Sequence, residues 1–172
     1  MKKIQSNEYI ALGTIAIVDI STPAYPKASM KIDLDVWLDL LDQGIGRVCC
    51  NGVGYAQARI RGKAARVHKI ITQHFNGHVD HENHDRLDNR SSNLRDVTPS
   101  ENQRNRSIGS LNKSGHIGIN EVKGVRGSTW RTTIWDGKKK VHLGVFKTID
   151  KAIVARKAAE VELGFHKNHG AK

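Results

Sequence analysis

Apolar positions in the first 45 residues change from strand spacing to helical spacing. Residues 8–20 are rich in Ile and Val, which predicts one or two strands. Residues 21–29 contain two prolines and predict a loop. From Leu34 onward, apolar residues recur with a helical period, and we expect that helix to end at Gly44. Trp37 falls on the apolar face of the helix and is therefore expected to anchor a core.

Two more segments before the middle of the chain carry a regular pattern. Residues 47–61 place apolar residues on both sides of the turn dipeptide Asn51-Gly52, which indicates one or two strands. Residues 65–75 carry apolar residues at helical spacing and predict a helix. His68 falls one position off that apolar set, so we expect a half-buried packing histidine here rather than a catalytic one.

The last third of the chain predicts a small sheet followed by a helix. The hairpin dipeptide Asp136-Gly137 separates two strand-like runs, and a third run precedes them. A helix is expected from Thr148 to Leu163, with Gly164 ending it and a stripe of alanines that lets it lie close to the sheet. The tail, residues 165–172, is expected to fray. The three expected strands span residues 116–120, 129–135 and 139–146.

The stretch from 78 to 107 differs from the rest because it crowds His, Asp and Asn into a short span. His78–His81 and Asn93–Val97 read as short strands, and the Asp- and Asn-rich residues between them predict a loop. Residues 98–101, Thr-Pro-Ser-Glu, form a capping-box pattern with Pro at the first helical position. The expected local order is therefore strand, loop, strand and helix, with Asn102 in the first turns of that helix.

The net charge of +11 indicates a polyanion as partner, and nucleic acid is the first candidate. An anionic membrane surface is the second, but the sequence has neither a run of about 18 apolar residues nor a basic amphipathic helix with a bulky apolar face. The charge is uneven: residues 1–78 carry a net +4, residues 79–106 a net −1 and residues 107–172 a net +8. Basic flanks of this kind can hold a phosphate backbone while the nearly neutral centre holds a metal.

Composition narrows the setting further. The hydrophobic share of 38% favours small modules over one large core. The two cysteines, Cys49 and Cys50, are adjacent, so they offer neither the spacing of a zinc ribbon nor a disulfide framework. We therefore expect a reducing cytoplasm. No apolar segment follows Met1 to Lys3, and no secretory signal is expected.

The central stretch has the residue types for phosphodiester hydrolysis. That reaction needs a deprotonated water, a neutralised phosphate and a stabilised leaving oxygen. One histidine can supply the first, and one metal on oxygen ligands can supply the other two. We expect His81 to be the base and Asn93 to hold it in the right tautomer. Asp80 and Asn102 are the expected metal ligands. The alternative is a purely structural loop rich in Asx turns.

These residues resemble the HNH endonuclease motif, in the variant of phage homing endonucleases. The similarity covers VDHENHDRLDNRSSNLRDVTPSENQRN, residues 79–105. It implies a ββα-metal finger in which His81 is the general base and Asn93 orients it. Asp80 and Asn102 then bind a divalent cation. Many members of the family have a third histidine at the position of Asn102, and an amide there favours Mg²⁺ or Mn²⁺ over Zn²⁺.

The C-terminal part has a resemblance of its own. The segments SGHIGIN and STWRTTIWDGKKKVHLGVFKTIDKAIVARKAAEVELG are similar to the ethylene-response-factor-type (APETALA-like) DNA-binding domain. This implies three antiparallel strands packed on one helix, with the sheet reading the major groove. Side-chain alternation places Arg131, Thr133 and Trp135 on the outer face. The residues expected to contact DNA, here and in the charged run before the central stretch, are Arg126, Arg131, Thr133, Trp135, Lys140, His142, Arg59, Arg61 and Arg66.

The expected fold class is α+β, in four parts. An N-terminal α+β region spans residues 1–77, and the ββα-metal motif spans residues 78–107. A linker, residues 108–113, leads to a three-stranded antiparallel sheet packed on one helix in residues 114–172.

Three functions remain open from the sequence. The first is a site-specific HNH homing endonuclease that hydrolyses double-stranded DNA with Mg²⁺ or Mn²⁺, as a monomer or homodimer, in the cytoplasm of a phage-infected bacterium. The second is a non-catalytic, sequence-specific DNA-binding protein on the same scaffold. The third is an RNA-binding module, which the few exposed aromatic residues expected on the sheet disfavour. Neither a membrane nor a small-molecule substrate is expected.

Overall fold

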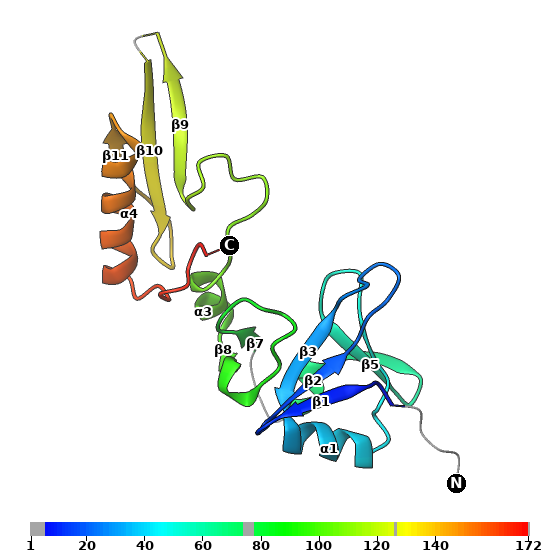
Figure 1. The fold of residues 1–172 in the computed structure, drawn as a ribbon. Coiled ribbons are helices and arrows are strands. Elements are labelled where there is room, and N and C mark those ends of the chain that lie inside the picture. Colours follow the sequence, from blue (N-terminus) through cyan, green and yellow to red (C-terminus); the bar gives the residue numbers. More distant parts are fainter. Residues whose placement is uncertain (1–5, 74–77, 126, 172) are drawn as a thin grey trace. The chain divides into compact units, whose positions relative to one another are not determined.

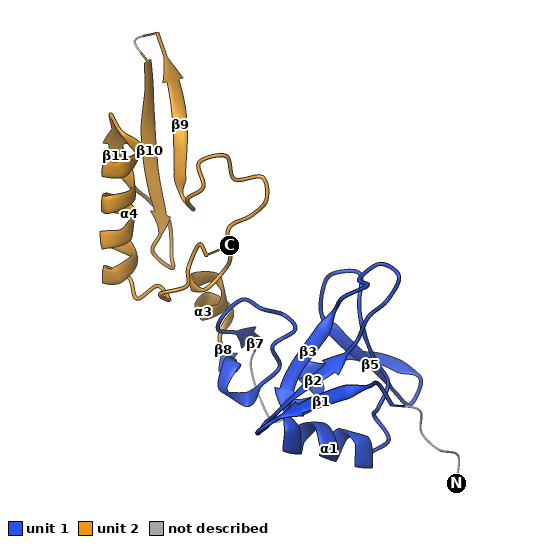
Figure 2. Ribbon diagram, in the orientation of Figure 1, with its two compact units in different colours: residues 1–97 blue, residues 98–172 orange. Residues whose placement is uncertain are grey.

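The chain divides into two compact units, residues 1–97 and residues 98–172, in a computed structural model (Figure 2). The structure describes residues 6–73, 78–125 and 127–171. Both helices and strands are present, and the strands form several small antiparallel sheets, which confirms the expected α+β class. Within the described parts of the chain, none of the helices is long and apolar enough to span a bilayer.

The first unit begins with β1 (Tyr9–Leu12), β2 (Ile15–Asp19), β3 (Ser29–Asp33) and α1 (Leu34–Asp42). The three strands form one antiparallel sheet in the order β1-β2-β3 (Figure 1). Alternate residues of β2 and β3 are buried: Ala16 pairs with Ile32, and Val18 pairs with Met30. The strands expected over residues 8–20 are confirmed, whereas the sequence pattern does not predict β3, whose short run follows the proline-containing loop directly.

A second sheet follows, made of β4 (Val48–Cys50), β5 (Ala56–Ile60) and β6 (Lys63–Arg66), and it leads into α2 (Val67–Ile71). The helix expected over residues 65–75 is therefore too long at both ends, since α2 stops at Ile71 and Thr72 and Gln73 form a turn. Its first residues pair with β5 instead, because Arg61 and Gly62 both have positive φ and turn the chain back as a tight hairpin. Residues 74–77 lie outside the described residues.

The β1-β2-β3 and β4-β5-β6 sheets of the first unit share one apolar core with α1. Trp37 is fully buried in it, as expected, and the Tyr9 ring lies edge-on to the indole at 6.2 Å. Val48, Ala58 and Val67 enter the same core from the second sheet and α2. Burial of this apolar surface is what fixes the two small sheets to each other.

The central stretch begins in the first unit with β7 (His78–His81), the single-turn helix η1 (Ser91–Asn93) and β8 (Leu94–Val97). The strands β7 and β8 pair antiparallel, with His81 opposite Leu94 and Asp80 opposite Arg95. Both expected strands are confirmed, except that Asn93 ends η1 and the strand starts one residue later.

The second unit contains α3 (Pro99–Arg104), β9 (Ile119–Gly124), β10 (Gly127–Trp135), β11 (Lys140–Phe146) and α4 (Ile149–Glu162). The capping box at Thr98 and Glu101 is present at the start of α3, as expected. The sheet has the order β11-β10-β9 and α4 packs on β10 and β11, which confirms the predicted hairpin and helix. The first strand was placed too early, at 116–120, because Gly118 has a φ of +76° and the strand begins only after it.

The face of α4 that meets the sheet differs from the expected alanine stripe. Ala152 is fully buried, but the next two buried positions on that face are Arg156 and Glu160, and Ala158 is exposed. Arg156 Nε donates to Glu160 Oε1 at 2.8 Å, and Arg156 Nη1 donates to the backbone oxygen of Thr133. Burial raises the pKa of Glu160, but hydrogen bonds from Lys157 and Arg156 outweigh this effect and hold the pKa below its usual range. The helix therefore packs through an ion pair as well as through small apolar residues.

The tail after α4 is packed rather than frayed, so that expectation is wrong. His169 is 4% exposed, and the Phe165 ring lies edge-on to it at 4.8 Å. The backbone N–H groups of His166 and Gly170 donate to the backbone oxygens of Arg104 and Arg106, at 3.1 and 3.0 Å. Backbone hydrogen bonds to the end of α3 and the residues after it hold the tail in place.

Candidate functional site

The end of β7 carries two of the predicted site residues, Asp80 and His81. Their side chains are mostly buried, with 9% and 5% of the residue surface exposed. Oδ2 of Asp80 accepts hydrogen bonds from Nε and Nη2 of Arg95, at 3.1 and 2.7 Å, across the β7–β8 pair. This charge-assisted pair fixes the orientation of the carboxylate next to His81.

His81 lies among other rings. Its imidazole meets that of His68 edge to face, with 5.0 Å between the ring centroids, and the Tyr55 ring lies at 6.0 Å. His81 Nε2 is buried and has no hydrogen-bond partner among the described residues. A buried nitrogen of this kind costs free energy unless a water or a ligand bonds to it, so Nε2 is the ring atom left for such a partner.

Both histidines of this cluster are neutral at neutral pH. Burial lowers the pKa of His81 from its ordinary value, and this prevails over the opposing effects of the Asn89 amide and three nearby carboxylates. The Asn89 amide is buried and makes no hydrogen bond with a described residue. Burial also lowers the pKa of His68 to about 3. A neutral imidazole is the form that can accept a proton from water.

Asn93 is buried, and its side chain holds the loop that follows His81. Its Oδ1 accepts from the backbone N–H of Asn83 at 3.0 Å, and its Nδ2 donates to the backbone oxygen of Asp88 at 2.8 Å. Among the described residues, no hydrogen bond joins the Asn93 side-chain carbonyl to the His81 ring, contrary to the predicted contact. Any orientation of His81 by Asn93 therefore acts through this loop, and the role itself stays a prediction.

The loop between β7 and η1 is tied to the β1-β2-β3 sheet and to the turn that leads into β5. The backbone of Lys31 in β3 donates to Leu87 at 2.9 Å and accepts from Asn89 at 2.7 Å. Nη1 of Arg86 donates to the backbone oxygen of Val53, in the turn before β5, at 2.8 Å. The N-terminal sheets thus serve as the frame that positions the residues around His81.

The donor chemistry of the predicted metal ligands suits a hard divalent cation. Asp80 offers a carboxylate oxygen and Asn102, on α3, offers an amide oxygen, the ligand types that Mg²⁺ and Mn²⁺ prefer. Across the residues that the structure describes, no three His, Cys, Asp or Glu side chains gather as a metal-binding group. Such a cation would therefore depend on water and phosphate oxygens for the rest of its coordination. Asp80 and Asn102 belong to separately described units, so their pairing stays a prediction.

Most of the residues expected to contact DNA are exposed, but Thr133 is not. It is 9% exposed, because a β-bulge between Thr132 and Thr133 breaks the alternation and because Gly118 covers it, accepting from Thr133 N at 2.9 Å. Arg126 lies outside the described residues. The exposed candidates are Arg59, Arg61, Arg66, Arg131, Trp135, Lys140 and His142.

A groove of about 640 Å³ in the second unit brings two of these candidates next to cations that the sequence pattern does not single out. Trp135 and Lys140 line it together with Arg104 and Arg106. No carboxylate is among its lining residues, and the indole of Trp135 is 57% exposed. Cations beside an exposed aromatic ring are the surface that binds a nucleic-acid backbone and its bases.

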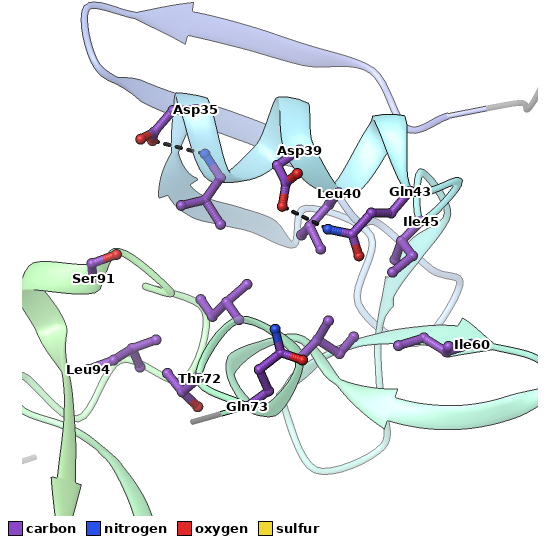
Figure 3. Close-up of a pocket in the computed structure, with 13 residues that line it drawn as sticks. Asp35, Asp39, Leu40, Gln43, Ile45, Ile60, Thr72, Gln73, Ser91 and Leu94 are labelled. Atoms are coloured by element: carbon purple, nitrogen blue, oxygen red, sulfur yellow. Dashed lines mark hydrogen bonds between the residues drawn. The ribbon is translucent and has the colours of Figure 1, made fainter. Parts of the chain in front are cut away.

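A larger cavity, about 750 Å³, lies in the first unit but not at the predicted site (Figure 3). Residues of α1 line one side of it, with Asp39 accepting a hydrogen bond from Gln43 at 2.7 Å. Ile60, α2 and Leu94 line the rest. None of Asp80, His81 and Asn93 lines this cavity, so its size carries no argument about the chemistry.

A family model described as HNH endonuclease matches residues 65–104. The matched range includes His68, Asp80, His81, Asn93 and Asn102, and it ends before β9. Neither the curated proteins nor the solved structures gave a match to the chain. The HNH endonuclease domain supports a nuclease and implies DNA binding, and HNH nucleases generally use a divalent metal. The resemblance of the C-terminal part to the ethylene-response-factor-type domain stays a prediction.

Proposed function

We propose that the protein is an HNH homing endonuclease that hydrolyses phosphodiester bonds of double-stranded DNA at a specific site. The observation that carries the proposal is the state of His81. It is a neutral, buried imidazole with an unpartnered Nε2, adjacent to the Asp80 carboxylate and inside the range matched by the HNH endonuclease family.

In this mechanism His81 accepts the proton of the attacking water at Nε2. As the water oxygen bonds to phosphorus, the bond from phosphorus to the leaving 3′ oxygen breaks. Asn93 keeps the loop after His81 in place, and Arg95 keeps Asp80 oriented. Asp80 and Asn102 would hold the divalent cation, Mg²⁺ or Mn²⁺, which neutralises charge on the phosphate and on the leaving oxygen.

Exposed cations in each unit support DNA as the substrate. Arg59, Arg61 and Arg66 lie at the β5–β6 hairpin, and the groove with Lys140 and Trp135 lies in the second unit. A C-terminal sheet of the ethylene-response-factor type would select the site, and the N-terminal cations would add backbone contacts.

Replacing the proposed base tests this function directly. His81→Ala is expected to keep DNA binding and to lower the cleavage rate by about 10²- to 10⁴-fold, the usual contribution of a general base. Cleavage of phage and host DNA is measured with Mg²⁺ or Mn²⁺ and again with a chelator. The matched control is His78→Ala, an exposed histidine on the same strand.

The alternative is a DNA-binding protein that keeps the same scaffold without catalysis. If the wild-type protein binds DNA but leaves it intact with every divalent metal tried, this alternative replaces the nuclease. Equal cleavage by His81→Ala and wild type would instead remove His81 from the role of base.

A further inference from the structure

Tyr55 and Arg86, which have no role in the mechanism above, belong to a side-chain cluster centred on the Tyr55 ring. Its ring contacts two guanidinium groups, with Cζ of Arg66 at 4.3 Å and Cζ of Arg86 at 4.8 Å from the ring centroid. The same ring lies 5.3 Å from His68 and 6.0 Å from His81, measured between centroids. Two cations are therefore gathered on one ring directly beside the proposed base.

Among the described residues of the first unit, no carboxylate pairs with these two arginines. Arg90 and Arg95, in the same region, each form an ion pair with an aspartate at 2.7 Å. Arg66 and Arg86 form no ion pair with any residue that the structure describes, and both are exposed. Two like charges on one ring repel each other, so the arrangement is most stable when an anion lies between or beside them.

The arrangement also orients the guanidinium planes. Arg86 donates from Nη1 to the backbone oxygen of Val53, and both arginines rest on Tyr55. An aromatic support and a fixed hydrogen bond reduce the conformational entropy that a long side chain loses on binding. A preoriented guanidinium is suited to bidentate binding of a phosphate.

We propose that Tyr55, Arg66 and Arg86 form a binding site for a phosphate of the DNA backbone, which holds the strand against His81. The proposal rests on the nuclease function and deepens it by naming the group that seats the substrate. The sequence predicts that Arg66 contacts DNA, because it belongs to a charged run. It does not predict a DNA contact for Arg86 or Tyr55. The loop that carries Arg86 is the one that Asn93 holds, so the base and the phosphate site share one support.

The test measures DNA affinity in chelator, so that cleavage plays no part. Arg66→Gln and Arg86→Gln are titrated onto a labelled 40-base-pair duplex at salt concentrations from 50 to 200 mM. Each variant is expected to bind about tenfold more weakly, and each should lower the slope of log affinity against log salt by about one. The double variant should lower the slope by about two. Arg86→Lys, which keeps the charge without the fork, should retain the slope and recover only part of the affinity.

Arg47→Gln is the matched control, because it removes one exposed charge from the first unit away from Tyr55. Thermal melting of every variant establishes that it is folded. If the double variant keeps wild-type affinity and slope, or if Arg47→Gln loses as much as either single variant, the phosphate site is overturned. A wild-type protein that binds DNA without cutting it would overturn the nuclease function and leave the phosphate site standing, whereas a wild-type protein that fails to bind DNA would overturn both.

Discussion

His68 shows how much the position of one side chain can depend on distant parts of the chain. Its place beside the apolar face of α2 predicts partial burial, yet it is 3% exposed and its Nδ1 has no partner within the described residues. The expectation of a half-buried histidine is therefore wrong in degree, because Tyr55 and His81 cover the ring from other elements. A buried neutral imidazole has a direct effect on stability as the pH changes.

The pKa of His68, lowered to about 3, predicts a loss of stability in acid. The folded protein resists protonation at this site while the unfolded chain takes up a proton near pH 6.5, so the contribution is complete above pH 6.5 and falls as the pH decreases toward 3. The decrease from this one group is at most about 1.4 kcal/mol per pH unit. Urea unfolding at pH 7.5, 6 and 5 should give a shallower decrease for His68→Gln than for wild type. If the free energy of unfolding falls equally with pH in both proteins, His68 does not contribute to the pH dependence of stability.

The site residues divide into those that sequence spacing can find and those it cannot. Asp80, His81 and Asn93 stand out because His, Asp and Asn are crowded within one segment. Tyr55 and His68 do not, because each comes from a separate element and meets His81 only through the packing of the β4-β5-β6 sheet and α2. The residue pattern within one segment does not show which side chains of other elements will pack against it.

The helix α4 packs on the sheet through a buried ion pair. Removing this pair should lower the free energy of unfolding by more than the length and composition of the helix suggest. Glu160→Ala should destabilise the folded protein by about 3 kcal/mol, since it leaves Arg156 buried without its partner. Lys157→Ala removes the other cation bonded to Glu160, but its side chain is 54% exposed, and the expected cost is about 0.5 kcal/mol. Chemical denaturation of the two variants compares them. Equal losses would mean that the pair contributes no more than a surface contact.

The secondary structure was largely predictable where the local signal is strong. The capping box before α3, the Asp136-Gly137 hairpin and the cap at Thr148 are each fixed by short-range hydrogen bonds, and each is confirmed. The errors lie where the chain is governed by pairing partners. β6 replaces the start of a predicted helix because it pairs with β5, and β9 starts late because of Gly118.

Across the chain as a whole, positive charge is available in both units. The expected contacts of the first unit lie on the β5–β6 hairpin, and the described ones of the second lie on β10 and β11. Asp80 lies in the first unit and Asn102 in the second, and their pairing around a cation stays a prediction. The prediction of a metal centre thus rests on the sequence motif. The proposal that His81 is the general base rests on its burial and its neighbours in the structure.

The exposed face of the β11-β10-β9 sheet is expected to contribute measurably to the affinity for DNA. Arg131→Ala should weaken DNA binding and lower the salt slope by about one, because Arg131 is exposed on β10 opposite Val145 and offers its charge to the phosphate backbone. Lys151→Ala, an exposed lysine on α4, is the control of equal charge. An unchanged affinity and slope for Arg131→Ala would remove this residue from the interface.

The packed tail has a genetic consequence. The backbone of His166 and Gly170 bonds to Arg104 and Arg106, at the end of the helix that carries Asn102 and just after it. A stop codon at Phe165 would remove His166 and Gly170, and it would therefore release the carbonyl groups that these bonds hold. Alleles truncated there should therefore be interpreted as lesions near a proposed metal ligand.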